Sequence, residues 1–242
     1  ALVLGASGAT GRLLVKELLQ KNAEVVAILR EGSSLAGYLE KVPNVQQNYR
    51  EVVANISELS EQDLIPLIEG RDAIFSCLGH NLTLRGMFGE PRRLVSDSIK
   101  RVCDAIEQLK PNTKTKIVLM NTTGNCNRDI PEKPPLSQRL VISVARGLLP
   151  PHADNEHAAD YLRESIAQNH PSIEWVVVRP DCLTNDELAS SYEVHTSPTR
   201  NVIFDSLPTS RINVAVFMAS LASDPTLWET WRGKMPVIYN EG

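Results

Sequence analysis

The sequence predicts an α/β fold in which a doubly wound parallel sheet forms a single domain, and three observations support it. The chain has 242 residues, of which 42% are hydrophobic, so it can bury one full core. Short apolar runs alternate with segments of helical periodicity along almost its whole length. The first apolar run enters the first helical segment through three glycines spaced three residues apart.

The apolar runs are rich in Val and Ile and show almost no alternation with polar residues. This composition is typical of parallel strands that are covered on both faces. The expected strands are ALVL (1–4), EVVAILR (24–30), YREVVAN (49–55), DAIFSCLG (72–79), KIVLMNTTG (116–124) and EWVVVRP (174–180).

Between these runs, apolar residues recur at the spacing of an amphipathic helix. The right-handed crossovers of parallel sheets would place such helices on both faces of the sheet. The expected helices are LLVKELLQ (13–20), SEQDLIPLIE (60–69), RLVSDSIKRVCDAIEQL (93–109) and HAADYLRESIAQ (157–168).

Two irregular segments interrupt the alternation within the single domain 1–242. Residues 125–155 follow the fifth expected strand and contain five prolines, and residues 181–211 follow the sixth. Open α/β sheets bind ligands in a crevice outside the carboxyl ends of their strands. We therefore expect both segments to form a small substrate-side lobe whose walls hold a small-molecule substrate.

The composition argues against several other functions. A formal charge of −4 with scattered Lys and Arg gives no basic stripe for nucleic acid, and no apolar run approaches the roughly 18 residues that span a bilayer. We therefore expect a cytoplasmic protein with no nucleic-acid or membrane partner, and a monomer and a homodimer are both open. No metal site is expected, because no CxxC pair occurs among Cys77, Cys103, Cys126 and Cys182.

The stretch GASGATG (5–11) has the composition of a phosphate-binding turn. Gly5 can make a tight strand-to-helix turn, Gly8 can let a diphosphate approach the backbone, and Gly11 can let the helix pack closely on the sheet. The N–H groups at the start of a helix favour an anion. The expected contacts are the backbone and hydroxyl groups of Gly5, Ser7, Gly8, Ala9, Thr10 and Gly11.

This turn has the spacing GxxGxxG. Together with the strand order it resembles the nucleotide-binding turn of the atypical and extended short-chain dehydrogenase/reductase superfamily. The closer likeness is to its NAD(P)H-binding branch, which includes NmrA-like and biliverdin/flavin-reductase-like proteins. The resemblance covers nearly the whole chain and implies a Rossmann-like fold. Further similar motifs are DAIFSCLG (72–79), WVVVRPDCL (175–183) and SRINVAVFM (210–218).

The end of the second expected strand favours NADP as the cofactor over NAD. An acidic residue at this position would bind the ribose hydroxyls of NAD, whereas an Arg can pair with the 2′-phosphate of NADP. The strand ends in Arg30, 19 residues after Gly11. Arg12 and Ser33 are expected to assist at the same phosphate. Glu31 would favour NAD if the strand ended one residue later.

The resemblance also implies contacts along the rest of the cofactor. Asn55 stands where the family usually has Asp near the adenine, so its amide is expected to hydrogen-bond the base. Cys77, Leu78 and Gly79 follow the fourth expected strand and are expected to line the ribose through backbone groups. Pro180 belongs to the Arg-Pro pair that the family carries after its sixth strand, and it completes the expected cofactor site.

The usual catalytic pair of the superfamily is absent from the sequence. Most members use a Tyr and a Lys spaced YxxxK to shuttle the substrate proton, and none of the five tyrosines here has a Lys four residues later. Alignment of ADYLRES (159–165) with the family's helix places Pro151 at the Tyr position and Asn155 at the Lys position. Hydride transfer is the cofactor's own chemistry, so this loss does not exclude an oxidoreductase.

Four residues are candidates to act on the substrate. Thr122, and after it Thr123, stand where the family offers Ser or Thr from its fifth strand. His152 and His157 can replace the Tyr as acid, because the unperturbed pKa of histidine is about 6.5; loop residues with no catalytic role are the alternative. His80 also lies beside the crevice, where a surface or capping role is expected.

Two functions remain open. The first is an NADP-dependent oxidoreductase that transfers hydride to a small carbonyl, quinone or flavin-like acceptor held between residues 125–155 and 181–211. The second is a non-catalytic, NADP(H)-sensing regulatory protein of NmrA-like type, whose affinity for a partner changes with redox state. The missing Tyr and Lys favour the regulator, and the long apolar segments beside the crevice favour the enzyme.

Overall fold

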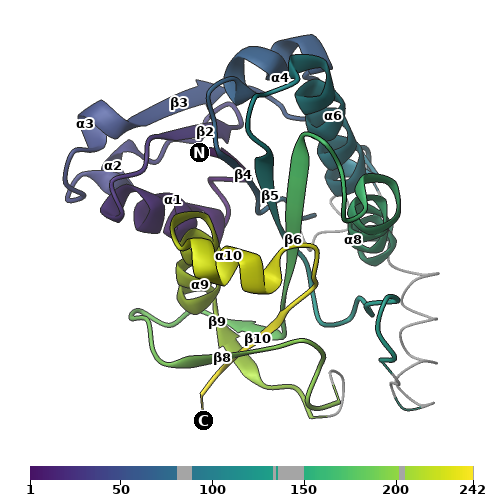
Figure 1. The fold of residues 1–242 in the computed structure, drawn as a ribbon. Coiled ribbons are helices and arrows are strands. Elements are labelled where there is room, and N and C mark those ends of the chain that lie inside the picture. Colours follow the sequence, from purple (N-terminus) through teal and green to yellow (C-terminus); the bar gives the residue numbers. More distant parts are fainter. Residues whose placement is uncertain (81–88, 133–134, 136–149, 202–204, 242) are drawn as a thin grey trace.

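The computed structural model describes residues 1–80, 89–132, 135, 150–201 and 205–241. An eight-stranded sheet crosses the molecule and is parallel except for the antiparallel pair β10–β8 at one edge (Figure 1). This confirms the expected doubly wound α/β fold. From edge to edge the strands are β3 (Tyr49–Val53), β2 (Val25–Leu29), β1 (Leu2–Leu4), β4 (Ala73–Ser76), β5 (Thr115–Met120), β6 (Ile173–Pro180), β10 (Val237–Asn240) and β8 (Tyr192–His195).

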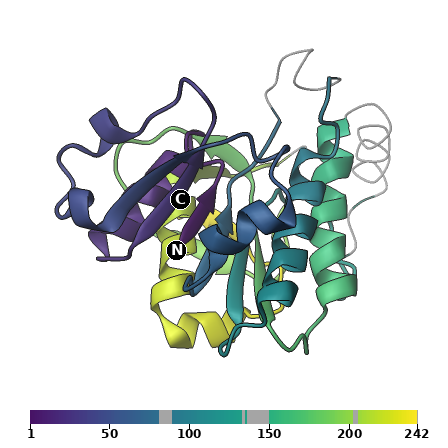
Figure 2. The same cartoon turned by 90° about the horizontal axis from the view of Figure 1, so that it is seen from above.

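Helices cover both faces of the sheet (Figure 2). One face carries α1 (Gly11–Gln20), α9 (Arg211–Ser223) and α10 (Pro225–Trp231), and the other carries α4 (Glu61–Ile68), α6 (Leu94–Leu109) and α8 (Pro150–Asp160). A π-helical turn, η1 (Tyr161–Ile166), continues α8. The short helices α2 (Ala36–Leu39) and α3 (Val45–Asn48) connect β2 to β3.

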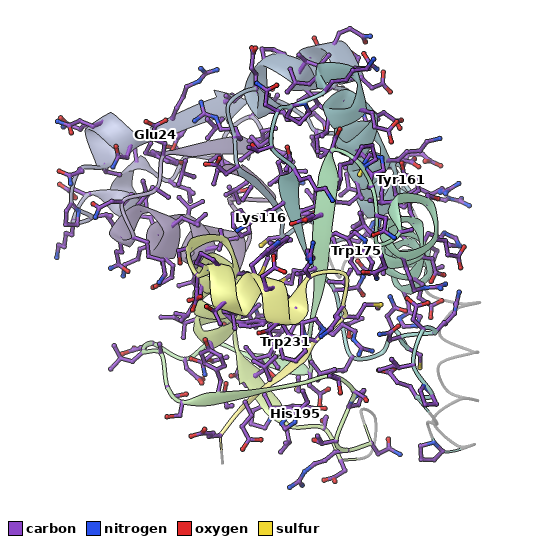
Figure 3. All side chains as sticks on the ribbon, in the orientation of Figure 1. Glu24, Lys116, Tyr161, Trp175, His195 and Trp231 are labelled. Carbon is purple, nitrogen blue, oxygen red and sulfur yellow. The ribbon has the colours of Figure 1, made fainter. Side chains whose placement is uncertain are left out.

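The two faces of the sheet bury separate apolar cores. All three residues of β1 and all five of β2 are buried, as the unbroken apolar runs predict. Trp231 lies in the core beneath α1 and α9, and Trp175 lies in the core beneath α6 and α8 (Figure 3). The indole N–H of Trp175 donates to the carbonyl of Ala167 at 2.7 Å, so the largest buried side chain leaves no polar atom unsatisfied.

Parts of the two segments expected to be irregular form regular structure, whereas residues 133–134 and 136–149 of the first segment lie outside the described residues. Residues 150–155 belong to α8, because Pro150 and Pro151 occupy the first turn, where a missing N–H costs no hydrogen bond. The segment 181–211 contains three short strands, β7 (Cys182–Thr184), β8 and β9 (Pro208–Ser210). Their pairing is non-local, since β8 pairs with β10 near the end of the chain.

A buried ion pair joins β6 to the segment that follows β5. Arg179 is 0% exposed, and its guanidinium makes two contacts with Glu132, of 2.7 and 3.1 Å. It also donates to the carbonyls of Met235 and Asn125, both at 2.8 Å, and of Thr196 at 3.2 Å. Arg179, the Arg of the Arg-Pro pair, therefore connects several segments of the chain near the carboxyl ends of the strands.

Candidate functional site

The glycine turn lies between β1 and α1, and two of its glycines are required by the fold. Gly5 has φ +71°, and a Cβ there would lie 2.7 Å from the backbone carbonyl of Cys77. A Cβ on Gly11 would lie 2.1 Å from the carbonyl oxygen of Gly5. Both distances exclude a side chain, so these residues pack the turn against β4 and against itself.

Gly8 differs from the other two glycines because it faces outward. It is exposed, its N–H donates to the carbonyl of Gly5 at 3.0 Å, and a Cβ would meet only that same oxygen, at 3.1 Å. A side chain at Gly8 would therefore project into the space in front of the turn. No acidic residue occupies the first turn of α1, and the capping position Thr10 makes no side-chain cap. The turn and the helix start together fit an anionic group.

A cleft of about 330 Å³ extends from the glycine turn along the carboxyl ends of β2, β3 and β4. It lies at the switch point of the sheet. From β1, the chain adds β2 and β3 on one side and then β4, β5 and β6 on the other. Apolar side chains of Ile28, Ile56 and Leu94 form part of its wall. It brings together eight predicted cofactor residues: Gly5, Ser7, Gly8, Arg30, Asn55, Cys77, Leu78 and Gly79.

The remaining predicted cofactor residues do not line this cleft. Ala9, Thr10 and Gly11 continue the turn into α1, and Pro180 lies at the buried end of β6, beside Ile238 of β10. Arg12 is exposed on α1, where its guanidinium lies 5.5 Å from the centre of the Tyr38 ring.

Arg30 is exposed at the end of β2, on the rim of the cleft. Ser33 closes a turn with it, since the Ser33 N–H donates to the Arg30 carbonyl at 3.0 Å. The nearby carboxylate of Glu51 accepts from the Ser34 hydroxyl at 3.0 Å and from the Leu35 N–H at 2.7 Å. These contacts hold Glu51 to the loop after β2. Arg30 itself is among the residues that line the cleft.

The amide of Asn55 is engaged in a local turn. Its Oδ1 accepts from the N–H of Ser57 at 3.2 Å and from the hydroxyl of Ser57 at 2.8 Å, and its Nδ2 donates to Glu58 at 2.6 Å. Asn55 thus shapes the loop that carries the apolar Ile56 into the cleft.

Cys77 lines the cleft and is buried. Burial raises the pKa of its thiol to about 12, so the thiol stays protonated at neutral pH. Its N–H donates to the carbonyl of Leu4 at 2.9 Å, which ties the end of β4 to β1 beside the glycine turn.

Thr122 and Thr123 both follow β5, but their hydroxyl groups differ in burial and in hydrogen-bond partners. The Thr123 hydroxyl is buried and donates to Asp181 at 3.0 Å. Desolvation raises the pKa of that carboxyl above its ordinary value. The Thr122 hydroxyl is half-buried and accepts from the N–H of Gly124 at 3.2 Å. Of the two hydroxyl groups, that of Thr122 is therefore the more accessible.

The structure brings His152 to the end of β5 and leaves His157 on an exposed face of α8. A Cβ on Gly124 would lie 3.2 Å from Cε1 of His152 and 3.7 Å from the Thr122 hydroxyl oxygen, so His152 and Thr122 flank the same glycine. Glu156, one turn further along α8 and buried, lies 3.6 Å from Nε2 of His152.

Sequence reasoning missed Asp154, a buried carboxylate with four hydrogen-bonding contacts behind the cleft wall. It is buried on α8, accepts hydrogen bonds from the start of α6 and lies 2.8 Å from Nε2 of His80. The surface position expected for His80 is wrong, because its side chain is only 4% exposed. These two residues are 74 positions apart, and no local pattern pairs them.

Within the part of the chain that the structure describes, no cluster of three or more His, Cys, Asp and Glu side chains could hold a metal ion. Among the same residues, no helix is both long enough and apolar enough to span a membrane.

Comparisons with known proteins agree with this geometry. The model of a family described as NAD(P)H-binding matches residues 5–225, and no curated protein matches the chain. Solved structures show the same Rossmann-like fold. A protein from Lactobacillus casei has a TM-score of 0.71 at 16% identity, and the match covers 100% of this chain and 99% of that one.

Two further solved structures with the same fold are described by an activity or a bound nucleotide. A Streptococcus pneumoniae protein assigned as an NADH-flavin reductase has a TM-score of 0.61 at 19% identity, over 99% of this chain and 98% of that one. A short-chain dehydrogenase/reductase from Veillonella parvula in complex with NADP has a TM-score of 0.65 at 13% identity, over 100% and 94% of the two chains.

Proposed function

Because the chain belongs to the NAD(P)H-binding family, we propose that it is an NADP-dependent oxidoreductase of the atypical short-chain dehydrogenase/reductase type. Its substrate would be a small carbonyl, quinone or flavin-like acceptor. The observation that carries the proposal is one cleft whose lining includes both the outward-facing Gly8 and Arg30. A diphosphate would bind at the glycine turn, and a 2′-phosphate would pair with the Arg30 cation.

Residues at the end of β5 and in the first half of α8 would supply the remaining groups. Bound NADPH would provide a hydride to the acceptor. Thr122 would donate a hydrogen bond to the acceptor oxygen, and His152, which flanks the same glycine, would release the proton that this oxygen takes up. The buried Glu156 carboxylate next to His152 would stabilise the protonated imidazole. This arrangement would replace the absent Tyr and Lys.

Turnover assays test the enzymatic part of the proposal. The protein would be mixed with NADPH and a panel of aldehydes, quinones and flavins, and the loss of nicotinamide absorbance followed. We expect turnover with at least one acceptor, and a lower rate for His152→Gln without a change in the Kd for NADPH. Tight binding of NADPH without turnover on any acceptor would contradict an oxidoreductase.

That result would instead support a non-catalytic NADP(H) sensor. The observation that favours a sensor is the composition of α8, where Pro151 and Asn155 stand at the positions of the catalytic Tyr and Lys. The Asn155 carbonyl accepts from the side-chain amide of Asn121 at 2.8 Å, so this part of α8 is tied to the end of β5. A sensor would bind NADPH and NADP+ with different consequences for a partner protein.

Arg30→Ala tests the choice of nucleotide. Loss of a charge-assisted contact to the 2′-phosphate is expected to weaken NADP+ about tenfold to a hundredfold and to leave NAD+ almost unchanged. Calorimetric titration of each nucleotide measures both values. Arg50→Ala, an exposed Arg on the neighbouring strand β3, is the matched control. Equal loss for NADP+ and NAD+ in Arg30→Ala would refute the assignment.

A further inference from the structure

The carboxylate of Asp154 joins three segments of the chain around the cofactor cleft. It lies on α8, and its side chain is 1% exposed. Its Oδ2 accepts from the N–H of Val95 at 2.8 Å and lies 2.8 Å from Nε2 of His80. Its Oδ1 accepts from the N–H of Ser96 at 3.0 Å and from the hydroxyl of Ser96 at 2.5 Å.

These contacts determine which atoms carry protons. The two backbone N–H groups can only donate, so both oxygens of Asp154 must accept, and a carboxylate offers about four acceptor sites in total. His80 therefore presents an N–H at Nε2, a tautomer assigned from the hydrogen-bond network. If an acceptor oxygen is removed, a buried donor loses its partner, and the desolvation cost of that donor is no longer offset.

Asp154 also completes the start of α6. The capping residue of this helix, Arg93, makes no side-chain hydrogen bond to the first turn. The N–H groups at a helix start need outside partners, and a negative charge is favoured there. A carboxylate from a different helix meets both needs, which ties α8 to the start of α6.

The two segments that Asp154 holds continue directly into the cleft wall. His80 follows Gly79 in the chain, and Val95 follows Leu94, and both Gly79 and Leu94 line the cleft. The contacts of Asp154 therefore hold the end of β4 and the start of α6 in a fixed relation. Asp154 itself is buried and is not among the residues that line the cleft.

We propose that Asp154 is a positioning residue for the nicotinamide dinucleotide, acting through His80 and Val95 to keep two cleft walls at the separation the cofactor needs. The proposal rests on the proposed function, because it concerns the same cleft. Arg30 contributes to the choice between the two nucleotides, whereas Asp154 sets the shape of the site. Its loss therefore weakens NADP+ and NAD+ by the same factor.

Asp154→Asn tests this role. The amide keeps the size of the side chain but replaces one acceptor oxygen with an NH2 group, which then faces N–H donors. We expect the Kd of NADP+ and of NAD+ to rise about tenfold each, with their ratio unchanged, in calorimetric titrations below the melting temperature. Asp97→Asn is the matched control, because it makes the same change on the first turn of α6 at a side chain that is 55% exposed.

A second measurement separates positioning from a loss of stability. Nitrogen-15 NMR of the His80 ring is expected to show Nε2–H in the wild type and a changed tautomer balance in Asp154→Asn. If Asp154→Asn does not fold, Ser96→Ala removes only the hydroxyl contact and is expected to weaken both nucleotides about threefold.

The outcomes distinguish this inference from the proposed function. A folded Asp154→Asn protein that binds both nucleotides as the wild type does would overturn the positioning role alone. A wild-type His80 ring without a proton on Nε2 would also overturn it. A wild-type protein that binds neither nucleotide would refute the proposed function, and the positioning role with it.

Discussion

Replacement of Arg179 by methionine is expected to lower the free energy of unfolding by about 3–5 kcal/mol, because it leaves the carboxylate of Glu132 buried without its cation. Glu132 is 4% exposed, and its Oε2 also accepts from the N–H of Asn127 at 2.8 Å. The loss of Arg179 also removes donors from the buried carbonyls of Met235 and Asn125 and from the carbonyl of Thr196. Urea unfolding, followed by circular dichroism, measures the change.

Two further variants sharpen this prediction. Arg232→Met is the matched control: its guanidinium pairs with Glu174 and Glu229 at the surface and is 41% exposed, so a loss of at most about 1 kcal/mol is expected. The double variant Arg179→Met with Glu132→Gln removes the unpaired charge and should recover part of the loss. If Arg179→Met unfolds at the same urea concentration as Arg232→Met, the buried pair has no structural importance.

Gly8→Val is expected to weaken NADP+ and NAD+ alike by about a hundredfold, or about 2.7 kcal/mol, because the side chain would fill the space where the diphosphate approaches the backbone. Stability should change by no more than about 1 kcal/mol, since a Cβ at this position meets only the Gly5 carbonyl. Calorimetric titration and thermal melting of the same sample measure the two effects.

Gly37→Val serves as the control for Gly8→Val. Gly37 lies in α2, and a Cβ there would meet no atom within 4 Å. The Gly37→Val protein is expected to bind both nucleotides with the affinity of the wild type. Unchanged affinity in a folded Gly8→Val protein would show that the turn holds no diphosphate. A large loss of stability would show that Gly8, like Gly11, packs the turn.

The parts of this molecule that could be predicted from the sequence are those set by local pattern. All six expected strands are present. The unbroken apolar runs of β1 and β2 are fully buried, as parallel strands covered on both faces require, whereas the edge strand β3 is only partly buried. The glycine turn was predictable because part of its requirement is local: Gly5 has φ +71°, and a Cβ on Gly11 would meet the carbonyl oxygen of Gly5. The close approach of Gly5 to Cys77 depends on the fold and was not predictable from the sequence.

The parts that could not be predicted depend on distant partners. Asp154 and Glu156 look like solvated charges of an ordinary helix, and only the fold places them against His80 and His152. Pro150 and Pro151 indicated a loop, although the first turn of a helix accepts proline. The edge strand β8 is defined by its pairing with β10, some 45 residues later.

Calorimetric titration of the wild-type protein with NADP+ and with NAD+ tests the central claim most directly. We expect both nucleotides to bind at the glycine turn, with the Kd of NADP+ lower by about tenfold or more if Arg30 pairs with the 2′-phosphate as proposed. The absence of heat with either nucleotide, together with an unchanged melting temperature, would contradict the account.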